Sequence, residues 1–289
     1  VILADILAIN LRTEILNSAF AEKAAHECTA FFTNTILDGN GAKQMVLGQN
    51  WDWKPSTSKA IIILEVAPDH GPNFVTVVEA GLMAKMGMNA AGVSLATNAL
   101  VTDLDQNQTG VPYHIILRAI LESSSFEGAV DMMQHISRAS AANYLLASQM
   151  GQVLDMEAGP GFGPDNLFPT PISSNYVHTN HFLCPTLPFV DVGLAQGPDS
   201  PIREERMLRF LQEAVNKPGV EALHLALSDH LNYPYSICCH PEEDKPIPEQ
   251  YATLASIIMD LPARRFWLAG DNPCQTQYQL LDYSEFLAG

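Results

Sequence analysis

The stretch "HECTAFF", residues 26–32, places a single cysteine, Cys28, at the mouth of a run whose threonine and aromatic residues predict a buried strand. Ahead of it, Ala4–Ala25 carries apolar residues at helical spacing, which predicts a helix leading into the cysteine. Free cysteine is among the most buried residue types, so packing is the simplest role for Cys28. The other role is that of a nucleophile, which requires a base beside the thiol.

The sequence offers two candidate bases for Cys28. His26 lies two residues before it, which in a strand places both side chains on the same face, but no later histidine has the spacing of a Cys-His protease. The second candidate appears if the bond between Glu27 and Cys28 is cut. The freed α-amine of Cys28, with a pKa of about 8, is then a base beside its own thiol.

The rest of the chain is predicted to alternate between groups of strands and pairs of helices, with no linker that would divide it into several domains. This order indicates sheets with helices on their outer faces. The expected strands are 44–53, 59–68, 73–81, 92–100, 142–148, 151–159, 251–261, 264–270 and 278–284, and the expected helices lie within 112–137, 200–217 and 219–231. A loop rich in proline and glycine is expected over 159–171.

Composition excludes several classes of function. The 289 residues carry a net charge of −17, which disfavours a nucleic-acid partner and favours neutral or cationic amines over dianions among substrates. No apolar run reaches the roughly 20 residues of a membrane span. The five cysteines are odd in number and scattered, which predicts a reducing, cytoplasmic location. Because the chain begins at Val1 and not at methionine, a processed product or a fragment is expected.

Eight segments together resemble one known family, in order along the chain. They are "NLRTE" (10–14), Cys28-Thr29, "GQNWDW" (48–53), "EAGLMAKMGMNAAGV" (79–93), "NAL" (98–100), "GVPYHIILRAILES" (110–123), "VHTNH" (177–181) and "NYPYSIC" (232–238). The chain is similar, from about Ala4 to Tyr283, to the acyl-coenzyme A:6-aminopenicillanic acid acyltransferase family, the autoproteolytic cysteine branch of the N-terminal nucleophile hydrolases. The resemblance implies an α+β fold, a four-layer αββα sandwich.

The resemblance also implies how the protein matures and reacts. Cleavage between Glu27 and Cys28 would leave a leader, residues 1–27, associated with a hydrolase domain, residues 28–289. Cys28 would then attack a linear small-molecule N-acyl amide, hold the acyl group as a thioester and pass it to water. One alternative is transfer of the acyl group from an amide or a coenzyme A thioester to an amine, and another is an uncleaved binding protein without catalysis.

Three polar residues receive catalytic or binding roles from the resemblance. Asp52 corresponds to the acid that holds the amine and thiol of Cys28, and Asn180 to a side-chain oxyanion donor. Asn98 corresponds to a second polar contact near the nucleophile. Without the resemblance, Asp52 is a turn acid beside core tryptophans and "HTNH" is a polar strand end.

Other residues are assigned to binding or to structure. Tyr233 and Tyr235 are expected to line the acyl pocket, with core packing an equal alternative. Arg12 and Glu14 are expected to bind the leader to the body of the protein. Neither a cofactor nor a metal is expected: His178 and His181 would be two ligands without a third.

Two positions depart from the family pattern. Gln250 stands where the family has a catalytic arginine, which makes amide hydrolysis a better expectation than transfer to penicillin nuclei. Glu27 stands where glycine commonly precedes the scissile bond.

Residues 203–209 are expected to be a solvated helix surface, and Cys238 and Cys239 are expected to be buried thiols at a strand end. The sequence leaves a homo-oligomer open.

Overall fold

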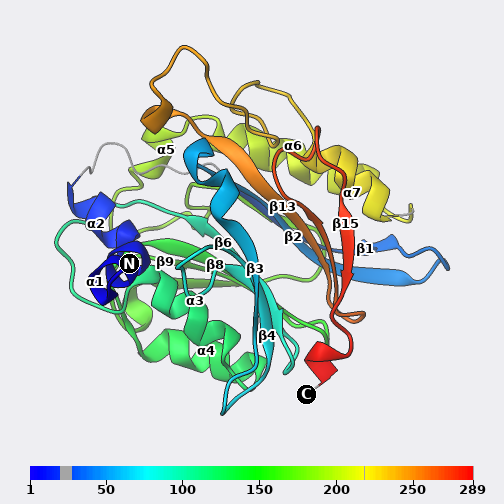
Figure 1. Ribbon diagram of the computed structural model, residues 1–289, viewed down its shortest axis with the longest axis horizontal. Coiled ribbons are helices and arrows are strands. Elements are labelled where there is room, and N and C mark those ends of the chain that lie inside the picture. The colour runs from blue at the N-terminus through cyan, green and yellow to red at the C-terminus, as the bar shows by residue number, and fades with distance from the viewer. Residues whose placement is uncertain (20–27, 218, 289) are drawn as a thin grey trace.

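Two antiparallel sheets stacked face to face form the centre of the protein, and a layer of helices covers each outer side (Figure 1). The computed structural model describes residues 1–19, 28–217 and 219–288. Each sheet has an apolar face against the other, as expected for strands that alternate inward and outward side chains. The predicted α+β fold, an αββα sandwich, is confirmed.

The first sheet has the strand order β12-β1-β2-β13-β14-β15, so that β1, the strand following Cys28, is paired on both sides. Its strands are β1 (Thr29–Leu37), β2 (Lys43–Trp53), β12 (Tyr176–His178), β13 (Ala252–Asp260), β14 (Arg265–Ala269) and β15 (Gln279–Asp282). Helices α6 (Ser200–Glu213) and α7 (Gly219–Leu227) pack on its outer face.

The second sheet has the strand order β11-β9-β8-β6-β5-β4-β3. Its strands are β3 (Ile61–Val66), β4 (Phe74–Glu79), β5 (Met86–Asn89), β6 (Val93–Ala99), β8 (Ala142–Ser148), β9 (Val153–Ala158) and β11 (Leu167–Pro171). Helices α3 (Tyr113–Leu121) and α4 (Phe126–His135) cover its outer face.

The leader begins with two short helices, α1 (Leu3–Asn10) and α2 (Arg12–Ala19), in place of the single predicted helix. The remaining short elements are a two-stranded ribbon of β7 (Ser137–Arg138) and β10 (Gly161–Phe162), helix α5 (Gly193–Gln196), and the 3-10 turns η1 (Pro55–Ala60), η2 (Pro164–Asn166), η3 (Ile247–Glu249) and η4 (Phe286–Ala288). In the described part of the chain, no helix has the length and hydrophobicity that crossing a bilayer requires.

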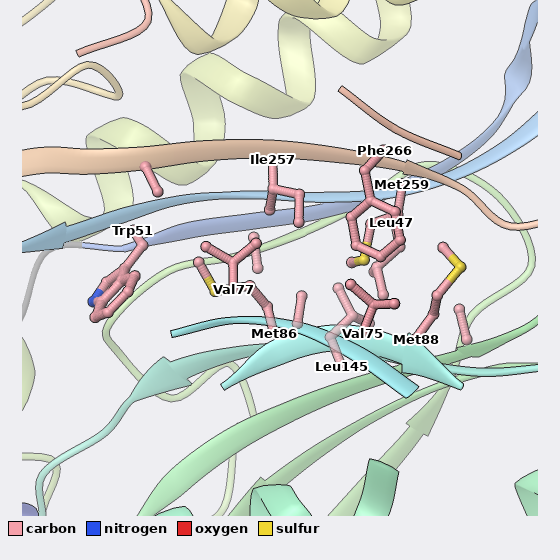
Figure 2. Packing of buried hydrophobic residues seen from close by; sticks show 14 of the residues in the cluster. Leu47, Trp51, Val75, Val77, Met86, Met88, Leu145, Ile257, Met259 and Phe266 are labelled. Atoms are coloured by element: carbon pink, nitrogen blue, oxygen red, sulfur yellow. The ribbon is translucent and has the colours of Figure 1, made fainter. Parts of the chain in front are cut away.

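The inter-sheet core is apolar along its length (Figure 2). In β1, Ala30 and Phe32 point into this core, whereas Phe31 points outward to α6 and α7. Phe31 pairs with Gly48 of β2, and a Cβ at Gly48 would lie 2.5 Å from the Phe31 ring. Glycine in the segment "GQNWDW" therefore lets the aromatic ring cross the neighbouring strand.

The side chain of Gln49 joins the two sheets through hydrogen bonds to the backbone. The amide of Gln49 donates to the backbone oxygen of Thr97 at 2.6 Å and accepts from the backbone N–H of Thr97 at 2.9 Å. Gln49 belongs to β2 and Thr97 to β6, so the paired bonds fix the register of one sheet against the other. The same two strands carry Asp52 and Asn98, so these bonds also fix the positions of Asp52 and Asn98 relative to each other.

Candidate active site

Cys28 lies immediately before β1, where the first sheet meets the leader. Its side chain is 2% exposed and faces the inter-sheet core with Ala30 and Phe32. The thiol sulfur lies 4.0 Å from the backbone oxygen of Asp52. Burial raises the pKa of the Cys28 thiol, and the positive charge of Lys85 opposes that rise.

The backbone of Cys28 is held on both sides by buried side chains. Its N–H donates to Oδ1 of Asn180 at 2.6 Å, and Nη1 of Arg203 donates to its carbonyl oxygen at 2.7 Å. Nη2 of Arg203 also donates to Oδ1 of Asn180 at 3.2 Å, so two donors converge on one oxygen. The Asn180 amide nitrogen donates to the backbone oxygen of Ala99 and keeps a second N–H, since an amide carries two.

The structure brings Asp52 and Asn180 to Cys28, and the predicted role of Asp52 in holding the amine and thiol of Cys28 stays a prediction. Asp52 is fully buried, and its Oδ1 accepts a hydrogen bond from Thr253 Oγ1 at 2.6 Å. The negative charge of Asp52 acts to raise the pKa of the Cys28 thiol. An oxyanion role for Asn180 stays a prediction.

Arg203 was missed from the sequence, where residues 203–209 were interpreted as solvated surface. That interpretation is wrong for Arg203, which is 1% exposed and also pairs with Asp199 at 2.9 Å. It suits Arg209, whose side chain is exposed. The signal lay in the spacing: Met207 and Leu211 follow Arg203 at four-residue intervals and are fully buried, so all three share the inward face of α6.

Lys85 is the second residue that sequence reasoning missed. It lies between β4 and β5 with 7% exposure, and its Nζ is 4.8 Å from the ring centre of Trp51 and 5.7 Å from that of Tyr113. Burial lowers the pKa of Lys85 to about 8, although Cys28 acts in the opposite direction. The signal was available, because Lys85 is the one charged residue between Glu79 and Asp103.

A cavity of about 20 Å³ adjoins the thiol, room for about one water molecule. Two residues of helix α2, Arg12 and Thr13, help to line it. The lining residues are Arg12, Thr13, Cys28, Trp51, Asp52, Trp53, Lys85, Ala99, Tyr113 and His114.

Arg12 and Glu14 both contact residues beyond Cys28, whereas their role in holding a cleaved leader stays a prediction. Arg12 forms an ion pair with Glu79 of β4, and its guanidinium lies 4.7 Å from the ring centre of Trp53. Glu14 acts through hydrogen bonds: its Oε1 accepts from the backbone N–H of Tyr113 and from Ser140, both at 2.8 Å.

Asn98 is fully buried on β6, and both polar atoms of its amide lack a hydrogen-bond partner among the described residues. Ala96 belongs to the same core cluster as Cys28, and strand alternation turns Asn98 to that same face. Leaving a buried polar group unpaired costs about 1–3 kcal/mol. A role as a second polar contact for substrate would explain this cost, and it stays a prediction.

The other predicted positions lie elsewhere. Tyr233 is 63% exposed, and the hydroxyl of Tyr235 bonds to Glu242 and Lys245; among the described residues, neither tyrosine lines the cavity at Cys28. The arrangement therefore gives their place in an acyl pocket no support. Gln250 donates to the backbone oxygen of Lys245. Glu27, the other half of the predicted cleavage site, lies outside the described residues.

The two histidines of "VHTNH" have separate partners. His178 Nε2 lies 2.9 Å from Glu157, and His181 Nδ1 lies 2.8 Å from Ser200 Oγ. They are thus not directed at one ion.

Comparison with known proteins places the sequence in one family. A model of the acyl-coenzyme A:6-aminopenicillanic acid acyl-transferase family matches residues 38–275. A curated protein of Emericella nidulans, the 40 kDa form of acyl-coenzyme A:6-aminopenicillanic-acid-acyltransferase, is 31% identical over 264 residues, covering 91% of this chain and 69% of its own. The chain belongs to this acyltransferase family. Membership makes it an enzyme of acyl-transfer and amide chemistry. The matched segment of the family model begins beyond Cys28.

Solved structures confirm the fold of this family member as that of the N-terminal nucleophile hydrolases. A conjugated bile acid hydrolase from Clostridium perfringens superposes with a TM-score of 0.61 at 13% identity, covering 91% of this chain and 94% of that one. A Caenorhabditis elegans ortholog of N-acylethanolamine-hydrolyzing acid amidase gives a TM-score of 0.55 at 12% identity, covering 81% and 93%. At these identities the likeness concerns the fold.

Proposed function

We propose that this chain is an autoproteolytic cysteine amidohydrolase that cleaves a linear small-molecule N-acyl amide through an S-acyl-enzyme at Cys28. The observation that carries the proposal is the setting of Cys28. Its thiol adjoins a small cavity, while Asn180 and Arg203 form hydrogen bonds to its backbone N–H and carbonyl oxygen. A cysteine that served only for packing would not need its backbone bound by a buried amide and a buried guanidinium.

Maturation would begin when Sγ of Cys28 attacks the carbonyl carbon of Glu27. The C–N bond between the two residues breaks, and the thiol proton passes to the departing nitrogen. Water then hydrolyses the thioester, which leaves a carboxylate on Glu27 and a free amine and thiol on Cys28. Room for about one water molecule beside the thiol suits this second step.

In the mature enzyme, the freed α-amine would take the thiol proton, since its ordinary pKa of about 8 lies close to working pH. The thiolate attacks the substrate carbonyl, and the second N–H of Asn180 donates to the oxygen that becomes negative. The leaving amine takes the proton back from the α-amine, and water releases the acid. Lys85 and Arg203 supply positive charge, because both act to lower the pKa of the Cys28 thiol.

Transfer to an amine acceptor is the second candidate, favoured by the activity named for the Emericella relative. Hydrolysis is the better proposal because Gln250 offers no charge where the family has its arginine. In either reaction the leader must shift, because a cavity of about 20 Å³ has no room for a substrate while Arg12 and Thr13 line it. The net charge of −17 favours a neutral or cationic leaving amine.

Intact mass spectrometry of the wild type, Cys28→Ala and Cys184→Ala tests the proposal. Cys184 is a matched control because it lies outside the cavity lining. The wild type and the control should split between Glu27 and Cys28, and Cys28→Ala should stay whole. If all three stay whole from mildly acid to alkaline pH, or if Cys28→Ala is also cut, the proposal fails and a non-catalytic binding protein is the better reading.

A screen of N-acyl amides, with and without hydroxylamine, then separates hydrolysis from transfer. Release of free acid alone supports the hydrolase, whereas a hydroxamate that forms at the expense of acid supports the transferase.

A further inference from the structure

A second group of reactive side chains lies outside the Cys28 site. It comprises His230, Cys238, His240 and Cys274, whose potential ligand atoms all lie within 4.8 Å of one another. Three of them belong to the segment between α7 and β13, and Cys274 belongs to the connection between β14 and β15. Residues from two distant parts of the chain therefore converge on one point.

Three of the four distances below lie in the range expected for the ligand atoms of a tetrahedral zinc ion, and the fourth is slightly shorter. The two histidine Nε2 atoms are 3.0 Å apart and the two sulfurs 3.6 Å apart. Nε2 of His240 lies 3.5 Å from Sγ of Cys238 and 3.4 Å from Sγ of Cys274. Zinc bonds of about 2.3 Å to sulfur and about 2.0 Å to nitrogen place tetrahedral ligands roughly 3.3–3.8 Å apart.

The chemistry of the donors selects the ion. Two cysteines and two histidines are soft and borderline ligands of the kind that zinc takes in closed structural sites, with four protein ligands and no open position. Binding releases the two thiol protons, so that two thiolates balance the charge of the dication. Asn272 supports the site: its Nδ2 lies 3.4 Å from Sγ of Cys238 and donates to the backbone oxygen of Cys239 at 2.7 Å.

A disulfide is the main alternative for the two thiols. Both cysteines are free, and their sulfurs are 3.6 Å apart, far beyond the roughly 2.05 Å of a disulfide bond. Nor would a disulfide account for the two imidazole nitrogens that face the same point.

We propose that His230, Cys238, His240 and Cys274 bind one structural zinc ion, which ties the segment after α7 to the β14–β15 connection. The ion also supports the catalytic residues indirectly. Cys239, between two ligands, accepts a hydrogen bond from the backbone N–H of Thr253 at 3.0 Å and donates its own N–H to Thr253 Oγ1 at 2.9 Å. That hydroxyl donates in turn to Asp52.

The test is zinc content and cobalt binding of the full chain. Wild type, Cys274→Ser and the control Cys184→Ser are purified from zinc-supplemented medium without chelator, and metal is measured by plasma mass spectrometry. We expect one zinc per chain in the wild type and the control. Cys274→Ser should lose zinc affinity by more than the roughly 10–100-fold cost of losing an outer partner.

Cobalt added to protein stripped of metal by a chelator gives a second measurement, the visible absorption spectrum, which reports on the ligands even if a variant is less stable. The wild type should show the visible bands of tetrahedral cobalt with thiolate charge transfer, and Cys274→Ser, folded by circular dichroism, should show weaker charge transfer. Metal-free wild type that binds no cobalt would overturn the proposal. So would equal zinc in Cys274→Ser, or peptide mapping that finds Cys238 and Cys274 joined.

Discussion

Lys85 is the residue beside Cys28 whose chemistry most invites a test. A lysine with 7% exposure is costly to bury, and negative charge on Cys28, when it is ionised, and on Glu79 favours the charged form of Lys85. We expect Lys85→Met to slow self-cleavage and turnover about 100-fold, as the loss of one positioned charge or donor does in other enzymes. Lys85→Arg, which keeps the charge, should restore part of the rate. Cleavage of Lys85→Met at the wild-type rate would exclude a role for this charge.

The same lysine predicts how stability depends on pH. Its pKa of about 8 in the folded protein lies below its ordinary value of 10.5, so between these pH values the unfolded chain binds the additional proton. Stability therefore rises with pH across this window, by on the order of 3 kcal/mol. Denaturant unfolding should show Lys85→Met more stable than the wild type at pH 7, with the gap closing toward pH 10.5. A difference in unfolding free energy between Lys85→Met and wild type that does not change with pH would contradict the lowered pKa of Lys85.

Residue by residue, the sequence was informative where a motif surrounded the position. Cys28, Asp52 and Asn180 stand in matched segments, and the structure brings all three together. Neither Arg203, which lies outside the matched segments, nor Lys85, which lies within one (residues 79–93), receives a role from the resemblance. Their importance comes from burial beside Cys28, and burial depends on which strands and helices pack together.

At the scale of elements, β12 and β9 position the loop that carries Asn180. His178, at the end of β12, is fully buried beside Asp155 and Glu157 of β9. Glu157 also accepts hydrogen bonds from the backbone N–H groups of Leu183 and Cys184. One carboxylate thus binds both ends of the turn around Asn180, which keeps that amide directed at Cys28.

Stability of this loop should depend on pH through His178. Burial alone would lower the pKa of His178, but Asp155 and Glu157 raise it to about 9, above its ordinary 6.5. The stabilisation that protonated His178 gives the folded protein is therefore complete below pH 6.5 and is lost as pH rises through 9. The difference in unfolding free energy between wild type and His178→Gln should be largest near pH 6 and shrink by on the order of 3 kcal/mol above pH 9. The exposed His135→Gln is the control, and a constant difference would refute the mechanism.

Element prediction failed where glycine and proline masked a strand. The four-residue β5 contains Gly87, where a Cβ would lie 2.0 Å from the backbone oxygen of Val75, so close strand packing requires the residue that weakens the strand pattern. Strand β11 contains Pro169 and Pro171. An edge strand tolerates proline, and β11 lies at the edge of its sheet. The sequence therefore indicated a loop over 159–171.

At the scale of the whole molecule, residues 1–19 of the proposed leader are joined to the rest of the protein by side-chain contacts. These contacts reach four separate places on the body. Asn10 bonds to Gly81 and Met83, Arg12 to Glu79, Glu14 to Tyr113 and Ser140, and Asn17 to Asp105. Since these contacts are spread over β4, α3 and several loops, a cut between Glu27 and Cys28 is not expected to release the leader.

We predict that the leader stays bound after cleavage and continues to restrict access to Cys28. Gel filtration of cleaved wild type should keep both pieces in one peak, and denaturing mass spectrometry should then separate them. Glu14→Ala removes an acceptor of two hydrogen bonds, so it should weaken retention and speed labelling of Cys28 by a small electrophile. Asp5→Ala is the matched control, because exposed Asp5 bonds within the leader to Ile2. Loss of the leader from the wild type on the column, or equal labelling of both variants, would mean that these contacts serve only the uncleaved chain.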